Sequence, residues 1–128
     1  MSLTVPPALA TQANEGDVHD AAFLACVRDS LPYAWNLISH VVERLHTEDG
    51  EFADNQTPPP DEAARGQLLR ALASDAIRGA LERHYGVRLA FQNCHRVAVF
   101  KPGAGAAYRE FTTPRAQILN QTPDLIDC

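Results

Sequence analysis

The chain has 128 residues, of which 45% are hydrophobic and 21% are charged, and its formal net charge is −5. This size and composition predict a single domain, residues 1–128, with a core of its own. The negative net charge argues against a general binder of the phosphate backbone but leaves room for a local basic patch. Because the sequence has neither an apolar run of about 18 residues nor a secretory signal pattern, we expect a cytoplasmic protein without a membrane span.

The charges are divided unevenly along the chain. Residues 1–64 hold two cations against eleven carboxylates, a formal charge of −9, whereas residues 65–128 hold nine cations against five carboxylates, a formal charge of +4. A small fold with an acidic part and a basic part has an electrical polarity that can orient a partner.

Helical periodicity dominates the first two thirds of the chain. The predicted helices, in chain order, span 6–14, 17–30, 33–46 and 61–85. Asp17 is expected to cap the second helix, and Gly86 to end the long fourth one in the left-handed conformation. Residues 47–60 are acidic and end in three consecutive prolines, which predict an irregular connection.

The hydrophobic period then changes from 3.6 to 2 and predicts a β-hairpin over 87–100. A three-residue loop at 92–94 would pair Leu89 with Val97 and place both on the buried face. Residues 107–111 are a candidate third strand, and threonine–proline pairs at 113–114 and 122–123 are typical helix starts. The sequence therefore predicts an α+β fold, mostly helical, with three to four helices packed on a small antiparallel sheet.

One long segment of the sequence is distinctive. The stretch EFADNQTPPPDEAARGQLLRALASDAIRGALERHYGVRLAFQNCHRVAVF, from Glu51 to Phe100, and the C-terminal PRAQILNQTPDLIDC resemble a family of small actinobacterial proteins of about 130 residues with no assigned activity. The resemblance implies a stand-alone, single-domain bacterial protein. It implies no ligand, cofactor or catalytic residue.

A thiol or metal centre is the first candidate site. Cys94 and His95 are adjacent at the hairpin tip, and with Cys26 and Cys128 they could supply soft ligands for zinc or an iron–sulfur cluster. However, structural zinc ligands usually come in pairs two to four residues apart, and none occur here. An odd number of cysteines in a reducing compartment predicts free thiols. Nearby arginines could activate Cys94 as a nucleophile, but no oxyanion-binding turn accompanies it.

A carboxylate–histidine site in the first half is a weaker candidate. The segment Asp17-Val18-His19-Asp20 carries metal-binding side chains, yet helix capping accounts for both acids. His40 and His46 are six residues apart and so lie on different sides of their helix.

Nucleic-acid binding is an alternative function. A long helix followed by a β-hairpin is the order found at the end of winged-helix domains, and cations on both elements could contact phosphates. These cations are Arg65, Arg70, Arg78, Arg83, Arg88, Arg96 and Lys101. Against this alternative, the predicted helix is longer than a typical recognition helix, and Asp75 and Glu82 accompany Arg78.

A protein partner or self-association is favoured over nucleic acid, largely because no other function has stronger support. Phe52 lies in an acidic, proline-stiffened segment without an evident core partner, so it either anchors an interface or folds back onto the long helix. The leading hypothesis is a non-catalytic cytoplasmic interaction or regulatory module. Its contacts would come from Phe52, Arg70, Arg78, Arg88, Arg96 and Lys101. The third alternative is a small thiol- or metal-dependent enzyme or ligand-binding protein centred on Cys94, His95 and Cys128. No cofactor is predicted, and no motif fixes an enzyme activity.

Overall fold

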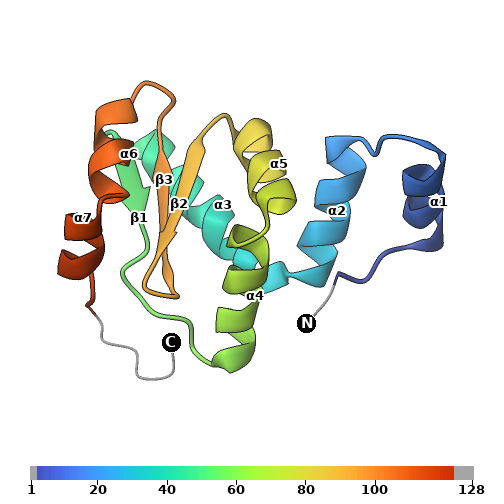
Figure 1. The fold of residues 1–128 in the computed structure, drawn as a ribbon, viewed down its shortest axis with the longest axis horizontal. Helices are drawn as coiled ribbons and strands as arrows, with labels where there is room; N and C mark the ends of the chain where they lie inside the picture. Colours follow the sequence, from blue (N-terminus) through green and yellow to red (C-terminus); the bar gives the residue numbers. More distant parts are fainter. Residues whose placement is uncertain (1–2, 123–128) are drawn as a thin grey trace.

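The computed structural model describes residues 3–122. Figure 1 shows the helices and strands in chain order: α1 (Pro7–Glu15), α2 (Asp20–Ser30), α3 (Pro32–Thr47), β1 (Phe52–Asp54), α4 (Glu62–Leu72), α5 (Asp75–Tyr85), β2 (Arg88–Gln92), β3 (Arg96–Phe100), α6 (Gly105–Phe111) and α7 (Pro114–Leu119). The predicted α+β fold is confirmed, although with more helices than expected.

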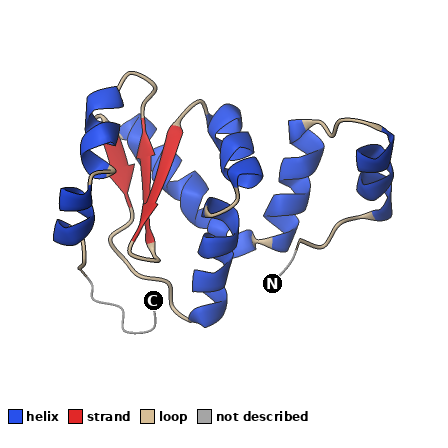
Figure 2. Ribbon diagram, viewed as in Figure 1, coloured by secondary structure: helices blue, strands red, loops and turns tan. Residues whose placement is uncertain are grey.

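The three strands form an antiparallel sheet in the order β1-β3-β2, with helices on both faces (Figure 2). Side chains alternate between the two faces of a strand, so each face has its own core. The larger core joins one face to α2, α3, α4 and α5, and its most buried members include Leu31, Ile38, Leu45, Leu68, Leu81, Leu89, Val97 and Val99. The smaller core joins the other face to the segment around α6 and consists of Ala90, Ala98, Phe100, Ala104 and Phe111.

The single long helix predicted over 61–85 is wrong, because the chain breaks between α4 and α5. The Ser74 hydroxyl accepts a hydrogen bond from the Ile77 N–H and caps α5. The Arg78 side chain donates to the Leu72 carbonyl at the end of α4. Both new helix ends therefore have side-chain partners for backbone groups that a helix end leaves unpaired.

The third strand is not at 107–111, which lies inside α6. Ala107, Tyr108 and Phe111 instead have helical spacing, and they pack with Phe100 in the smaller core. The third strand is β1, within the segment predicted to be irregular, and it pairs Phe52 with Phe100 and Asp54 with Ala98.

The predicted hairpin is confirmed, but its register is shifted by two residues. The loop comprises residues 93–95, so Leu89 pairs with Val99 and Phe91 pairs with Val97. Asn93 and Cys94 adopt positive φ angles of 53° and 57° to make this turn. A shift of two residues leaves every side chain on its predicted face, because the side-chain period of a strand is two.

The other predicted helices are present with shifted ends. Asp17 does not cap the second helix, which begins at Asp20 with His19 in the cap position. Thr113 caps α7 as expected by accepting from the Ala116 N–H, whereas the start at 122–123 extends beyond the described residues. Among the helices that the structure describes, none is long and apolar enough to cross a membrane.

Two glycine substitutions test the helix assignments. Gly86 ends α5 at φ 64°, so Gly86→Ala should lower the free energy of unfolding by about 1 kcal/mol because a Cβ disfavours this conformation. Gly66 lies inside α4, where an added Cβ meets no atom within 4 Å. Gly66→Ala should therefore raise the free energy of unfolding by about 0.5–1 kcal/mol. Urea unfolding measures both changes, and shifts of the same sign would contradict the assigned helix ends.

Candidate functional site

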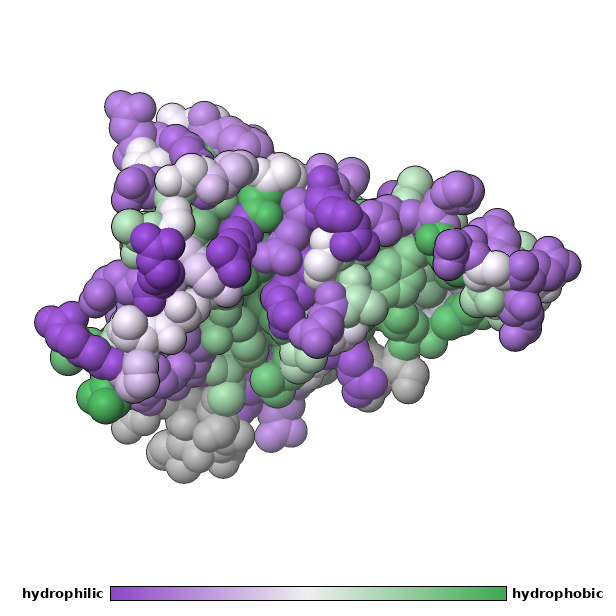
Figure 3. Space-filling view, turned by 45° about the horizontal axis from the view of Figure 1, so that its top comes forward, coloured by the Kyte–Doolittle hydropathy of each residue, from purple (hydrophilic) through white to green (hydrophobic). Residues whose placement is uncertain are grey.

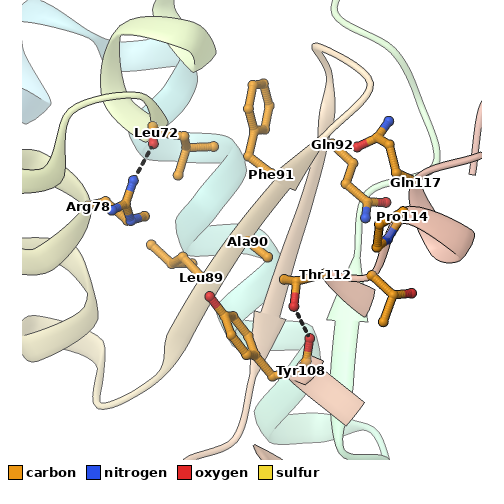
Figure 4. Close-up of a pocket in the computed structure, with 11 residues that line it drawn as sticks. Leu72, Arg78, Leu89, Ala90, Phe91, Gln92, Tyr108, Thr112, Pro114 and Gln117 are labelled. Carbon is orange, nitrogen blue, oxygen red and sulfur yellow. Dashed lines mark hydrogen bonds between the residues drawn. The ribbon is translucent and has the colours of Figure 1, made fainter. Parts of the chain in front are cut away.

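A groove of about 510 Å³ runs along β2. Figure 4 shows Leu72 and Arg78 on one side of it and Tyr108, Thr112 and Pro114 on the other. Leu89, Ala90, Phe91 and Gln92 of β2 form its floor. The groove therefore lies where the α4–α5 turn, the outer strand of the sheet and the α6–α7 segment meet.

Backbone groups of β2 point into this groove. The Val97 N–H donates to Asn55 Oδ1, and the Val97 carbonyl accepts from the Asn55 N–H, so both polar groups of Val97 face β1. Phe91 is the partner of Val97 across the hairpin. Because backbone groups alternate in direction along an antiparallel ladder, Phe91 directs its own N–H and C=O to the outer edge. The Leu89 N–H points the same way and donates to Glu82 Oε2 at 2.8 Å.

A stacked cation and aromatic ring border the groove. The guanidinium carbon of Arg88 lies 3.8 Å from the centroid of the Tyr108 ring, a cation–π contact that holds the guanidinium against the ring. Arg88 is nevertheless an exposed residue. A planar, exposed guanidinium can stack on a nucleobase or contact a phosphate.

The six residues expected to form one interface do not all lie together. Phe52 and Arg88 are both cross-strand partners of the residue before Lys101, so these three lie at one end of the sheet. Arg78 lines the groove but is tied to the Leu72 carbonyl at 2.8 Å and to Asp75 Oδ1 at 2.5 Å. Arg96 is only partly exposed, with 17% of its side chain accessible, and it pairs with Asp54 at 2.6 Å and donates to Asn120 Oδ1 at 3.0 Å. The remaining cations, Arg70 and Lys101, are exposed at the end of α4 and directly after β3.

Phe52 is half-buried rather than free in a loop. It stacks on Phe100 with ring centroids 5.1 Å apart and is tilted against Phe111 at 6.3 Å. Its side of the sheet borders a hollow of about 340 Å³ that Leu119 also lines. Phe52 thus has the core partners that the sequence did not reveal, while 43% of it stays exposed.

The structure does not assemble the proposed thiol or metal centre in the residues that it describes. Cys94 is disulfide-bonded, so the predicted free thiol is wrong there. His95 is buried with Nδ1 against the Asn93 carbonyl, and Cys26 is free and buried within α2. Cys128 lies outside the described residues. Within residues 3–122, no three His, Cys, Asp or Glu side chains are grouped so that they could hold a metal ion.

The acidic and basic halves of the chain pair with each other. Arg83 of α5 donates to both carboxylate oxygens of Asp20 in α2, at 2.7 and 3.0 Å. This hydrogen bonding, assisted by the positive charge of Arg83, holds the pKa of the Asp20 carboxyl below its ordinary value of 3.8. Since the folded-state pKa is lowered, the pair stabilises the fold above the ordinary pKa of aspartate, and this contribution is lost as the pH falls through the lowered value. Asp20 belonged to the predicted carboxylate–histidine site, and in the structure its carboxylate is the partner of Arg83.

Sequence reasoning missed the residues on the α6–α7 side of the groove. Tyr108 was missed because its segment, 107–111, was predicted to be a strand, and no sequence pattern pointed to Thr112 or Gln117. The helical spacing of Ala107, Tyr108 and Phe111 was the available signal.

The different surroundings of Arg96 and Arg88 predict different losses of stability. Arg96→Ala leaves the largely buried Asp54 carboxylate without its charged partner, so the free energy of unfolding should fall by about 3 kcal/mol. Arg88→Ala removes an exposed cation–π contact and should cost about 0.5–1 kcal/mol. Urea unfolding of the two variants separates these values. Equal, small losses would show that Arg96 is a surface residue.

Comparisons with curated proteins and with solved structures gave no match. A model of one protein family, described as NucS shadow ORF, matches residues 1–128. The chain therefore belongs to the NucS shadow ORF family.

Proposed function

We propose that the protein binds single-stranded nucleic acid in the groove along β2. The observation that carries the proposal is the outward direction of the Phe91 N–H and C=O, at the open edge of the sheet and on the floor of a groove. Unstacked bases present hydrogen-bonding edges and flat faces that a paired duplex hides. A backbone edge can pair with the base edges, as it would pair with another strand.

Arg88 adds the second kind of contact that such a ligand needs. Its guanidinium carbon lies 3.8 Å from the centroid of the Tyr108 ring, so the contact restricts the position of the guanidinium before a ligand arrives. Bases stack on aromatic rings and on guanidinium planes, and the positive charge attracts phosphates. Arg88 thus offers stacking and charge beside the groove, next to the lining residue Tyr108.

The name of the family model also carries the abbreviation KH, which denotes a nucleic-acid-binding module whose Gly-x-x-Gly loop clamps backbone nucleotides. The strand-helix-helix-strand-strand-helix order from β1 to α6 fits that label. The sequence has no Gly-x-x-Gly, and α4 is joined to α5 by Ala73 and Ser74. Without that clamp, phosphate contacts would rest on exposed cations such as Arg88 and Arg70. The winged-helix alternative assumed one long helix before the hairpin, and the 11-residue helix α5 stands in that place.

The charge of this part of the chain suits weak, salt-dependent binding. Residues 51–119 hold nine cations against seven carboxylates, a formal charge of +2, whereas residues 1–50 hold two cations against seven carboxylates, a formal charge of −5. Few phosphates can then be neutralised at once. We expect dissociation constants of about 10⁻⁴–10⁻⁶ M, as for binding without strong sequence preference.

Fluorescence anisotropy with labelled 12-nucleotide RNA and DNA homopolymers tests the proposal. Arg88→Ala and Tyr108→Ala should each weaken binding at least about fivefold, because base stacking contributes ~1–3 kcal/mol per base. Arg28→Ala is the matched control, since it removes an exposed cation from α2, on a helix that does not line the groove.

Three outcomes decide the result of that titration. Loss of affinity in Arg88→Ala with little change in Arg28→Ala supports the groove. Equal losses in the two variants would mean that only net charge matters. No binding of any homopolymer at 50 mM salt would contradict the proposal.

A protein-binding surface around Phe52 is the second candidate function. Phe52, Ile118 and Leu119 are 43%, 70% and 63% exposed, and Phe52 and Leu119 border the same hollow. Exposed apolar side chains beside a hollow are typical of protein-association sites. This surface keeps the predicted contact through Phe52 but leaves out Arg96, which is paired with Asp54. The cytoplasmic location and actinobacterial origin predicted from the sequence remain expectations.

Self-association through this surface can be measured by sedimentation velocity over a range of protein concentrations. The wild-type chain should gain mass as its concentration rises, and Leu119→Ser should remove that gain because it takes away an exposed apolar contact. Leu69→Ser is the control, since Leu69 of α4 is also exposed, at 41%, but does not line that hollow. A monomeric wild-type chain at every concentration would contradict self-association.

A further inference from the structure

A second hollow, of about 420 Å³, lies between α1, α2 and α5. Figure 3 shows hydrophobic side chains gathered on the right, between the body of the molecule and its projecting N-terminal part. In Figure 1, α1 and α2 lie at the opposite end of the molecule from α6 and α7. The hollow is therefore separate from the groove along β2.

The walls of the hollow are apolar, and helix α1 covers it without filling it. Its lining includes Val5, Leu9, Val18, Phe23, Cys26 and Ala76. No residue of α1 is buried, which is unusual for a helix that lies over apolar side chains. Protein interiors are packed densely, so an apolar hollow of this size is a space suited to a ligand.

The charged groups at the hollow already have charged partners. Asp20 and Arg83 form their two-point ion pair at its rim, and Asp75 is paired with Arg78. The Cys26 thiol donates to the Thr4 carbonyl at 3.4 Å. An ionic ligand would have to displace one of these partners, whereas an uncharged apolar ligand would displace only water.

We propose that this hollow binds an uncharged, largely apolar small molecule. Its volume is at the lower end of the range for ligand pockets, about 300–1,000 Å³, so one or two fused rings or a short acyl chain would fit. Such a ligand removes apolar wall surface from water and contacts α1 and α5 at the same time. Binding should therefore hold α1 against the rest of the protein.

The test is a fluorescence titration of the full chain with N-phenyl-1-naphthylamine, an uncharged dye that brightens in apolar surroundings. We expect saturable binding of one dye per chain. Ala76→Phe should weaken it at least tenfold, because Ala76 is an exposed residue of α5 that lines the hollow and a phenyl ring there occupies the ligand's space. Ala63→Phe is the matched control, since Ala63 is exposed in the first turn of α4 and does not line the hollow. Circular dichroism checks that both variants fold.

A second dye tests the charge of the ligand. 1-Anilinonaphthalene-8-sulfonate has the same rings and one added sulfonate, so it should bind more weakly than the neutral dye. Tighter binding of the sulfonate would overturn the proposed ligand class. Unsaturable dye binding, or equal affinity of wild type and Ala76→Phe, would overturn the site itself.

Hydrogen exchange gives an independent readout. Amides of residues 7–15 should become more protected when the neutral dye is bound, and unchanged exchange there would contradict the role of α1 as cover. Ala76→Phe should leave oligonucleotide binding unchanged, since this site does not rest on the groove. Loss of both activities in that variant would show that the two sites are not separate.

Discussion

The side chain of Asn55 fixes which strand of the sheet is central. Asn55 follows β1, and its Oδ1 accepts from the Val97 N–H at 2.6 Å while its Nδ2 donates to the His95 carbonyl at 2.8 Å. These bonds extend the pairing of a three-residue strand that would otherwise be short for a stable ladder. With β1 attached to one side of β3, β2 becomes an outer strand, and the outward direction of the Phe91 N–H and C=O follows from that position. The groove thus depends on a buried amide at the far side of the sheet.

The elements that the sequence predicted well are those with long, regular hydrophobic patterns. The first three helices and the hairpin were found because one strong period ran through each of them. The wrong predictions are at places where a single polar side chain determines the local secondary structure. Ser74 caps α5, so the chain forms two helices although the apolar pattern continues through this point. Asn55 bonds to the Val97 N–H and so attaches the short strand β1, which lies in the acidic connection, to β3. Neither effect has a periodic signature, so pattern analysis alone could not show it.

The candidate site was predicted only in part, and charge is the reason. Seven of the nine cations of the second half, Arg83 and Arg96 among them, were expected from the sequence to be available to phosphates. In the structure, Arg96 and Arg83 pair with Asp54 and Asp20 of the acidic half. The division of charge along the chain therefore serves partly to hold the two halves together. Arg88, by contrast, is exposed and contacts the Tyr108 ring.

Helix α5 is the wall that the groove and the apolar hollow share. Arg78 and Glu82 are four residues apart and face the β2 side, whereas Ala76 and Arg83 are seven apart and face the α1–α2 side. Residues at these spacings lie on the same face of a helix. The Ser74 cap and the left-handed Gly86 fix both ends of α5. One face of the helix can therefore bind a ligand while the residues on its other face stay in place. A ligand in the hollow would then restrict the motion of α1, which has no buried residue, and leave the edge of β2 unaltered.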